Sequence, residues 1–296
     1  MNFIINAFRG FCMALADSVP GVSGGTVAFI LGFYDKFVNS LNDVIYGNKE
    51  AKKEALKFLI KWACGWIIGM ALASLVLASL FEVHIYNISS LFLGFIIFAI
   101  PLIIKEEKEQ LKGKYKNIIF TIIGIAIVAL ITYFNPVAGS EGAVDITNLS
   151  FGLALYIFFA GMVAISAMIL PGISGSTLLL IFGLYIPIIS AIKELLHFNL
   201  SYFPVLLIFG IGIIVGILLV IKLIKKALEK YRSQTIYTII GLMLGSLYAI
   251  VMGPTTLDVP KAPMNFDTFS IVFFIIGAGV ILGLQLLQKA MKKKDI

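Results

Sequence analysis

The sequence predicts an all-α polytopic membrane protein made of two inverted repeats, each a broken, re-entrant helical hairpin followed by three transmembrane helices. Composition is the first reason. The 296 residues are 60% hydrophobic and only 13% charged, and a soluble domain does not carry so much apolar surface. The second reason is an apolar motif with a Pro-Gly-x-Ser-Gly core, which occurs in residues 13–34 and again in 164–185. The third is the clustering of basic residues, which indicates the topology.

The first repeat is expected to cover residues 1–140 and the second residues 141–296. A helix needs about 20 apolar residues to cross ~30 Å of hydrocarbon, and uncharged stretches of this kind recur along the chain. The predicted spans, three in each repeat, are 62–81, 85–104, 117–134, 198–221, 233–253 and 268–288. Two longer apolar segments, 3–38 and 146–192, contain the motif, and each is predicted to form a hairpin.

The lysines and arginines fall mainly in three loops and in the tail, within 36–61, 105–116, 222–232 and 289–294. The positive-inside rule places these regions, and with them the C-terminus, in the cytoplasm. The second and third basic loops are both predicted inside, and two spans and the segment 146–192 lie between them. The two spans alone return the chain to the inside, so segment 146–192 must enter and leave the membrane on the same side, which is the outside. Segment 3–38 ends on the inside at Lys36, so the two hairpins have opposite orientations, as in secondary transporters. The alternative is two complete membrane helices per motif, joined by a tight loop without a role in transport.

The interrupted motif is the candidate site, because irregular backbone inside a bilayer is costly unless it lines a cavity. The helix after each interruption presents free N–H groups with about half a positive charge to the membrane centre, and Ser23 or Thr26 is a candidate cap for the first. Such a helix start suits an anion, above all a phosphate. The candidate substrate-binding residues of the two loops are Pro20, Gly21, Ser23, Gly24, Gly25, Thr26, Pro171, Gly172, Ser174, Gly175, Ser176 and Thr177. The alternative is that the glycines only permit close helix packing.

Three charged residues besides Lys36 lie in the first hairpin, and the second hairpin has none at the aligned positions. Arg9 and Asp17 are about two helical turns apart and share roughly one face, and Asp35 follows the second arm. A charge inside a membrane indicates a function by default. Arg9 is a candidate bidentate partner of a phosphate, and Asp17 and Asp35 are candidates for coupling to H⁺ or Na⁺. The alternatives are a structural Arg9–Asp17 pair and a solvated Asp35 at the membrane surface.

The sequence argues against several other classes of function. Residues 21–25 match the G-x-S-x-G pattern of serine hydrolases, but no strand precedes them and both histidines lie in loops predicted outside. We therefore expect no catalytic residue and no enzyme. Cys12 and Cys64 are not expected to form a disulfide or to bind a metal. No cofactor is expected besides the coupling ion, and the net charge of +7 reports topology rather than binding of nucleic acid.

Two stretches, RGFCMALADSVPGVSGGTVAFILGFYD and SAMILPGISGSTLLLIFGLY, resemble the paired signatures of the polyprenyl-phosphate transporter family, which was formerly a family of unknown function. The resemblance covers essentially the whole chain. It implies a protein of the bacterial or archaeal cytoplasmic membrane that moves undecaprenyl phosphate from the outer to the cytoplasmic leaflet, so that this carrier lipid is recycled in cell-wall synthesis. Arg9, Asp17 and the two loops carry over by position, whereas the family often has Glu where this chain has Asp35.

Two other functions stay open on the residues alone. A membrane phosphatase acting on polyprenyl pyrophosphate needs an acid, a base or a nucleophile at the phosphate, for which only Asp17, Ser23 and Ser174 are at hand. An ion-coupled transporter of a small anion has the same site chemistry. The coupling ion, the direction of transport and the formation of a homo-oligomer are not determined by the sequence.

Overall fold

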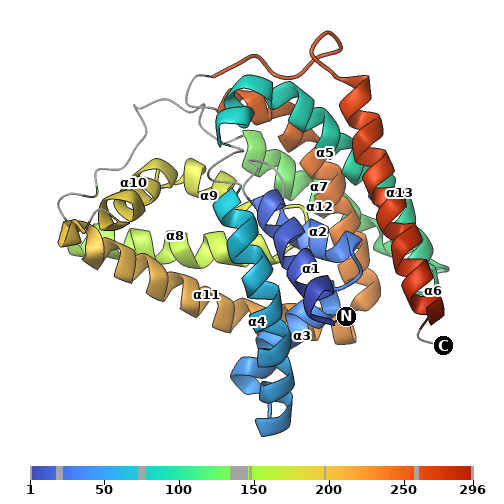
Figure 1. Ribbon diagram of the computed structural model, residues 1–296, viewed down its shortest axis with the longest axis horizontal. Helices are drawn as coiled ribbons and strands as arrows, with labels where there is room; N and C mark the ends of the chain where they lie inside the picture. The colour runs from blue at the N-terminus through green and yellow to red at the C-terminus, as the bar shows by residue number, and fades with distance from the viewer. Residues whose placement is uncertain are drawn as a thin grey trace.

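The computed structural model describes residues 2–17, 23–72, 78–133, 146, 149–196, 198–256 and 260–294 (Figure 1). Within these ranges the regular structure consists of α-helices and short 3₁₀ turns, without a strand. Six of the described helices are long and apolar enough to cross a membrane. The prediction of an all-α, multi-pass membrane protein is therefore confirmed.

The two motif segments fold in the same way, as a long helix, a break, a short helix and a second turn. The elements are α1 (Asn2–Asp17), α2 (Gly24–Ile30) and α3 (Tyr34–Tyr46) in the first segment, and α8 (Phe151–Ile169), α9 (Gly175–Ile181) and α10 (Tyr185–Leu196) in the second. The second turn contains Gly32 with φ of 65° in one segment and the aligned Gly183 with φ of 63° in the other. Glycine adopts this left-handed conformation without steric cost, so the aligned glycines explain why both short helices end at the same place.

The other long helices correspond to the predicted spans. They are α4 (Lys49–Leu72), α5 (Ala78–Glu106), α7 (Ile118–Tyr133), α11 (Phe203–Lys230), α12 (Arg232–Met252) and α13 (Ile271–Lys294). The span predicted at 62–81 overlaps α4 but has different limits. Helix α4 begins at Lys49, because the charged stretch before the predicted span, residues 49–61, is rich in Lys, Glu, Ala and Leu, which favour helix. The next helix, α5, begins at Ala78, within the predicted span. The backbone of α5 is kinked at His84, next to the predicted start of the following span.

Two groups of helices can be distinguished by their packing. In the hairpin bundle, comprising α1–α4 and α8–α11, α1 packs on α4, α8 packs on α11, and α3 packs on α11. In the four-helix bundle, comprising α5, α7, α12 and α13, α12 packs on α7 and α13 packs on α5. Figure 1 shows α8 beside α11 at one side of the molecule and α5 beside α13 at the other. Each bundle contains helices from both predicted repeats, so the two halves of the chain interlock.

Glycines bring the backbones of these helix pairs into contact at matching places. A Cβ on Gly65 would lie 1.7 Å from the carbonyl oxygen of Ala7, and one on Gly212 would lie 2.2 Å from that of Phe158. These are the α1–α4 and α8–α11 crossings, which correspond in the two halves. The packing scheme thus recurs, which is consistent with the internal repeat. The opposite orientation of the two halves in the membrane stays a prediction.

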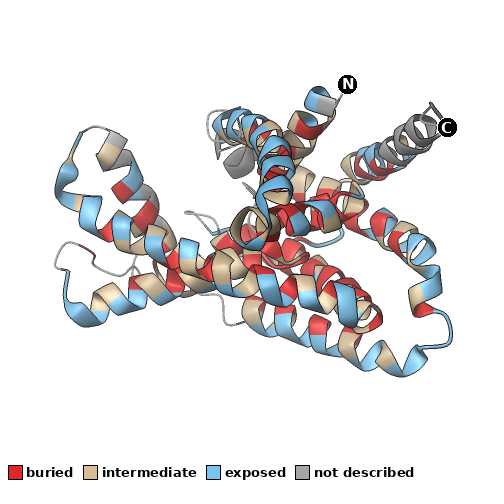
Figure 2. Ribbon diagram, turned by 90° about the horizontal axis from the view of Figure 1, so that it is seen from below, coloured by how far each residue is buried: buried red, intermediate tan, exposed pale blue. Residues whose placement is uncertain are grey.

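Helix α12 lies at the centre of the molecule. Ile236, Met243 and Ile250 along it are fully buried, and its residues join a core cluster with side chains from α2, α3, α5 and α11. Figure 2 shows that buried positions gather where the elements cross and that exposed positions follow the outer helices. By contrast, most residues of α7 are not buried within the chain, as expected of a helix that faces lipid.

Candidate functional site

The breaks of the two hairpins lie against each other. The hydroxyl of Ser23 donates a hydrogen bond of 2.9 Å to the carbonyl oxygen of Leu170. In the opposite sense, the backbone N–H of Gly172 donates one of 2.7 Å to Oγ1 of Thr26. A Cβ on Gly25 would lie only 2.8 Å from the carbonyl oxygen of Ile169. We call this contact between residues 23–26 and 169–172 the tip contact. It joins segments that are about 147 residues apart in the sequence.

The tip of the second hairpin requires a glycine at position 172. Its φ is +87°, a conformation that residues with a side chain rarely adopt. In addition, a Cβ there would lie 2.5 Å from the backbone carbonyl carbon of Leu242 in α12. The tip contact therefore rests against α12, the central helix of the four-helix bundle.

Asp17 lies at the start of α2, where the sequence predicts an external anion. Its Oδ1 accepts a hydrogen bond of 2.8 Å from the N–H of Gly24, and its Oδ2 accepts one of 3.2 Å from Nε1 of Trp66. The expected cap by a hydroxyl is wrong. Ser23 is the N-cap residue but makes no side-chain cap bond, because its hydroxyl is engaged in the tip contact, as is that of Thr26. The carboxylate satisfies the helix start instead.

The second hairpin has the same geometry with different chemistry. Met168 takes the place of Asp17, since a Cβ on Gly175 would lie 2.4 Å from Cγ of Met168 and one on Gly24 would lie 2.5 Å from Oδ1 of Asp17. A thioether is only a weak hydrogen-bond acceptor. The polar side chains here are hydroxyls, with 2.7 Å between Oγ of Ser174 and Oγ of Ser176. One tip thus carries a carboxylate and the other carries paired hydroxyls.

Arg9 lies on the long arm of the first hairpin, away from the tip contact. Its Nη1 donates a hydrogen bond of 3.2 Å to Oδ1 of Asn6, and its guanidinium carbon lies 5.2 Å from the ring centroid of Phe33. The helical rise separates Arg9 from Asp17 by about 12 Å along α1. Arg9 forms no ion pair with any residue that the structure describes, so the alternative of an Arg9–Asp17 pair is wrong. Within the described part of the chain, Arg9 is a cation without an acidic partner.

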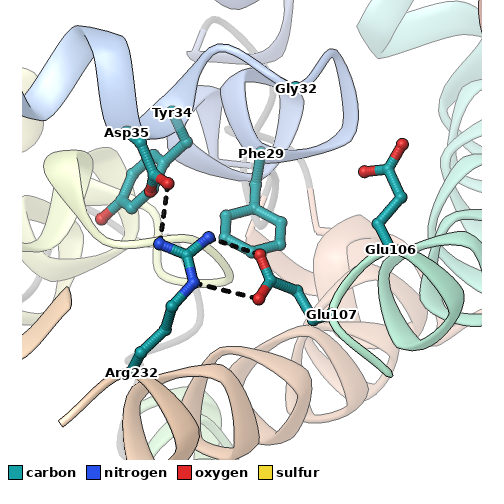
Figure 3. A pocket seen from close by; sticks show the side chains of 7 residues that line it. All are labelled: Phe29, Gly32, Tyr34, Asp35, Glu106, Glu107 and Arg232. Atoms are coloured by element: carbon teal, nitrogen blue, oxygen red, sulfur yellow. Dashed lines mark hydrogen bonds and ion pairs between the residues drawn. The ribbon is translucent and has the colours of Figure 1, made fainter. Parts of the chain in front are cut away.

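Asp35 belongs to a different cluster, at the far end of α2 from the tip, which we call the Arg232 cluster and which consists of Asp35, Glu107 and Arg232. Its Oδ2 lies 2.9 Å from Nη1 of Arg232, and Nε of Arg232 donates a hydrogen bond of 3.0 Å to Oε2 of Glu107. A second contact joins Nη2 of Arg232 to Oε1 of Glu107. Figure 3 shows the guanidinium between the two carboxylates, with Glu106 standing apart from them. The alternative of a merely solvated Asp35 is therefore incorrect, because this carboxylate is half-exposed but paired.

The cluster borders a polar cavity of about 310 Å³. Its lining comes from α2, α3, α12 and the end of α5, and comprises Phe29, Gly32, Tyr34, Asp35, Glu106, Glu107 and Arg232 (Figure 3). Sequence reasoning missed Arg232 and Glu107, which it treated as part of charged loops. One signal was present: Arg232 is the sole arginine in the basic regions, where every other cation is lysine, and arginine is the residue that binds carboxylates in a fixed, forked geometry.

Some predicted site residues cannot be placed. Pro20 and Gly21 lie outside the described residues. The backbone of Thr177 belongs to α9, but its side chain is not described. Trp66 is a site residue that the sequence did not indicate. In the described part of the chain, no group of three or more His, Cys, Asp and Glu residues is arranged to hold a metal.

Comparison with known proteins assigns the chain to a family. The model of a family described as undecaprenyl phosphate translocase-like matches residues 13–268. The chain belongs to this family. Two relatives cover nearly its whole length, and both are named polyprenyl-phosphate transporter. One, from Staphylococcus aureus, is 36% identical over 282 residues, which are 95% of each chain. The other, from Vibrio cholerae, is 29% identical over 318 aligned positions, which cover 96% of this chain and 97% of the relative. No solved structure is significantly similar.

The region matched by the undecaprenyl phosphate translocase-like family includes most of the features described above. Residues 13–268 contain both motifs, Asp17 and all members of the Arg232 cluster, whereas Arg9 lies just before the matched region. The names of both relatives are those of transporters, not of enzymes. Membership in this family thus confirms the resemblance that the two motifs indicate.

Proposed function

We propose that this protein transports a polyprenyl phosphate across the membrane, and that the tip contact is where its phosphate group binds. The observation that carries the proposal is the direct contact between the two broken hairpins, within an apolar helical fold of a family whose relatives are named as transporters of this lipid. A polyprenyl phosphate combines an anionic head with a long apolar tail. A charged head crosses hydrocarbon only at great energetic cost, so the protein needs to shelter the head while the tail stays in lipid.

The tip contact offers suitable hydrogen-bond donors for a phosphate. The hydroxyl of Ser23 and the N–H of Gly172 each make one cross-tip bond here, and the hydroxyls of Ser174 and Ser176 bond to each other. A neutral bond of this kind contributes about 1 kcal/mol net, whereas hydrogen bonds to an ionised oxygen are roughly twice as strong. A phosphate at the tips would exchange these neutral bonds for stronger ones to its ionised oxygens, and we call the arrangement in which the tips bond to each other closed.

Asp17 is proposed to couple transport to protons. Its carboxylate occupies the N–H of Gly24 and brings a negative charge to the site, so it competes with a phosphate. Protonation removes this charge and weakens the bond to Gly24, which frees the start of α2 for the substrate. Binding of Na⁺ beside the carboxylate would neutralise it in a similar way. Met168 occupies the equivalent place in the second hairpin, so only the first tip carries this control.

Arg9 is proposed to attract the phosphate on its way to the tips. A cation without an acidic partner is costly within a membrane, and Arg9 has only Asn6 and the ring of Phe33 as its described partners. Its guanidinium keeps donors free to bind a phosphate in a forked manner. For Asp35 the ion pair with Arg232 supports a role in conformational change.

The direction and setting of transport are part of the same proposal. Undecaprenyl phosphate would be returned from the outer to the cytoplasmic leaflet of the plasma membrane, in support of carrier recycling for cell-wall synthesis. The cytoplasmic side is the one with the lysine-rich loops, by the positive-inside rule. This assignment rests on the family and on the charge pattern of the sequence.

Counterflow of labelled undecaprenyl phosphate in proteoliposomes is the test of this proposal. We expect uptake of label that is competed by the unlabelled lipid and not by inorganic phosphate. Competition by inorganic phosphate would favour the small-anion transporter instead. Release of phosphate from undecaprenyl pyrophosphate by the same purified protein would favour the phosphatase. Absence of lipid counterflow in an intact, folded preparation would refute the proposed function.

A further inference from the structure

The Arg232 cluster joins the two helix bundles at one end of the molecule. Arg232 is the first residue of α12, and Glu107 lies between α5 and α6 (Lys108–Leu111), so both belong to the four-helix bundle or its connections. Asp35 lies in the first turn of α3, in the hairpin bundle. The Arg232–Asp35 pair is therefore a contact between the bundles, whereas the Arg232–Glu107 pair lies within one of them.

The two contacts of Arg232 have different roles by geometry. Glu107 binds the guanidinium through two of its nitrogens, Nε and Nη2, and this forked geometry fixes the direction of the side chain. Nη1 is thereby left to face Asp35. Glu107 is the less exposed carboxylate, at 15% of its side chain against 45% for Asp35. Glu107 accordingly fixes the position of the Arg232 side chain, whereas the ion pair between Arg232 and Asp35 is the one that can break.

The neighbouring contacts show what the cluster restrains. Asn117 in the turn η2 (Tyr115–Asn117) donates a hydrogen bond of 2.9 Å to Ser233, and Thr121 of α7 donates one of 2.8 Å to the carbonyl oxygen of Tyr237. These bonds tie the start of α12 to α7. On the other side, α3 follows α2 after a three-residue turn, and α2 begins at the tip contact. The Arg232–Asp35 pair thus connects the first turn of α12, which is bonded to α7, to the first turn of α3, which follows α2 in the first hairpin.

The same helix also reaches the second tip. Leu242, which contacts Gly172, lies ten residues after Arg232, about 15 Å along α12. Besides the apolar core that α12 shares with α2, α3 and α11, the two bundles therefore meet at two levels along this helix: where Gly172 lies against Leu242, and at the Arg232–Asp35 pair. A movement of the hairpin bundle along α12 cannot occur while both contacts hold.

We propose that Arg232 and Asp35 form a latch that holds the hairpin bundle against the four-helix bundle on the lysine-rich face of the protein, and that the latch must open in each transport cycle. The inference rests on the proposed transport function. A half-exposed ion pair is suited to this task, because such pairs shift an equilibrium by no more than about fivefold and break readily. The adjoining polar cavity of about 310 Å³ gives water access to the separated charges when the pair opens.

Covalent closure of the latch is the decisive experiment. In a protein with Cys12 and Cys64 replaced by serine, the double variant Asp35→Cys and Arg232→Cys is joined by a short bifunctional thiol reagent that contains a reducible bond. Counterflow of labelled undecaprenyl phosphate is then measured before and after reduction. We expect the cross-link to reduce transport at least tenfold and reduction to restore it to the level of the same variant without cross-linker.

A matched control is available one residue away. Asn117→Cys with Ser233→Cys places the same cross-link at the start of α12 but within the four-helix bundle, where the two residues already contact each other. Transport in this variant should persist after cross-linking. Transport that continues with residues 35 and 232 joined, or that stops equally in the control, would overturn the latch. The parent protein distinguishes a failure of the latch from a failure of the proposed function. If the parent protein shows no lipid counterflow, transport itself is refuted and not only the latch.

Discussion

Replacement of Gly25 by alanine places a methyl group between the two hairpin tips. The added Cβ would lie 2.8 Å from the carbonyl oxygen of Ile169 and 3.0 Å from the carbonyl carbon of Leu170. Both atoms belong to the backbone, so neither rotates away, and the tips must separate. Overpacking of this kind costs about 1–3 kcal/mol, which shifts an equilibrium between conformations by roughly 5- to 150-fold. We expect the closed arrangement of the tips to be destabilised by this amount, and lipid counterflow to fall at least fivefold, because the transport cycle has to return through the closed arrangement after the phosphate leaves.

The assay compares Gly25→Ala with a glycine whose Cβ position is free. At Gly210 in α11 nothing lies within 4 Å of an added methyl group, and alanine is favoured over glycine in a helix by about 1 kcal/mol. Gly210→Ala should therefore transport normally and unfold at the same or a higher temperature. If Gly25→Ala matches Gly210→Ala in both counterflow rate and thermal unfolding midpoint, the tips do not make the contact described here and the reasoning is refuted.

Three further predictions concern the polar groups of the first hairpin. Thr26→Val removes the acceptor of the Gly172 N–H. Thermal or denaturant unfolding should therefore show a loss of about 1–3 kcal/mol, and Thr26→Ser should show little loss. Arg9→Gln removes a charge that is unpaired among the described residues, so transport should be abolished with an unchanged unfolding midpoint; flux at the wild-type rate would dismiss its phosphate role. Wild-type transport should rise as pH falls, because protonation of Asp17 releases the Gly24 N–H. Asp17→Asn should abolish this dependence, and an unaltered pH profile would disprove coupling at this residue.

The helical architecture was predictable from the sequence because the bilayer restricts the choices. Long uncharged stretches predict spanning helices, and the repeated Pro-Gly-x-Ser-Gly core predicts two breaks at equivalent places. Both breaks occur, with α2 and α9 of the same length and aligned glycines at Gly32 and Gly183. The pairing of helices between the two halves was not predictable. It depends on which glycine-lined faces meet, and Gly241, for example, gives no indication that it opposes Thr121.

The residues of the candidate site were easier to predict than their partners. Ser23, Thr26 and Gly172 of the motif lie at the tip contact, and their binding of a substrate stays a prediction. The sequence assigned the start of α2 to a substrate anion, however, and the structure places Asp17 there. A carboxylate seven residues before a helix start returns to it only if the intervening loop folds back, which spacing alone does not reveal. Arg232 was missed for a related reason, since its partners are 125 and 197 residues away in the sequence.

A structure of this protein with undecaprenyl phosphate bound, determined by electron cryomicroscopy in a lipid nanodisc, tests the central claim most directly. The account predicts phosphate density within hydrogen-bonding distance of both hairpin tips, with the bonds from Ser23 to Leu170 and from Gly172 to Thr26 broken. Phosphate density elsewhere, with these two bonds intact, would contradict it.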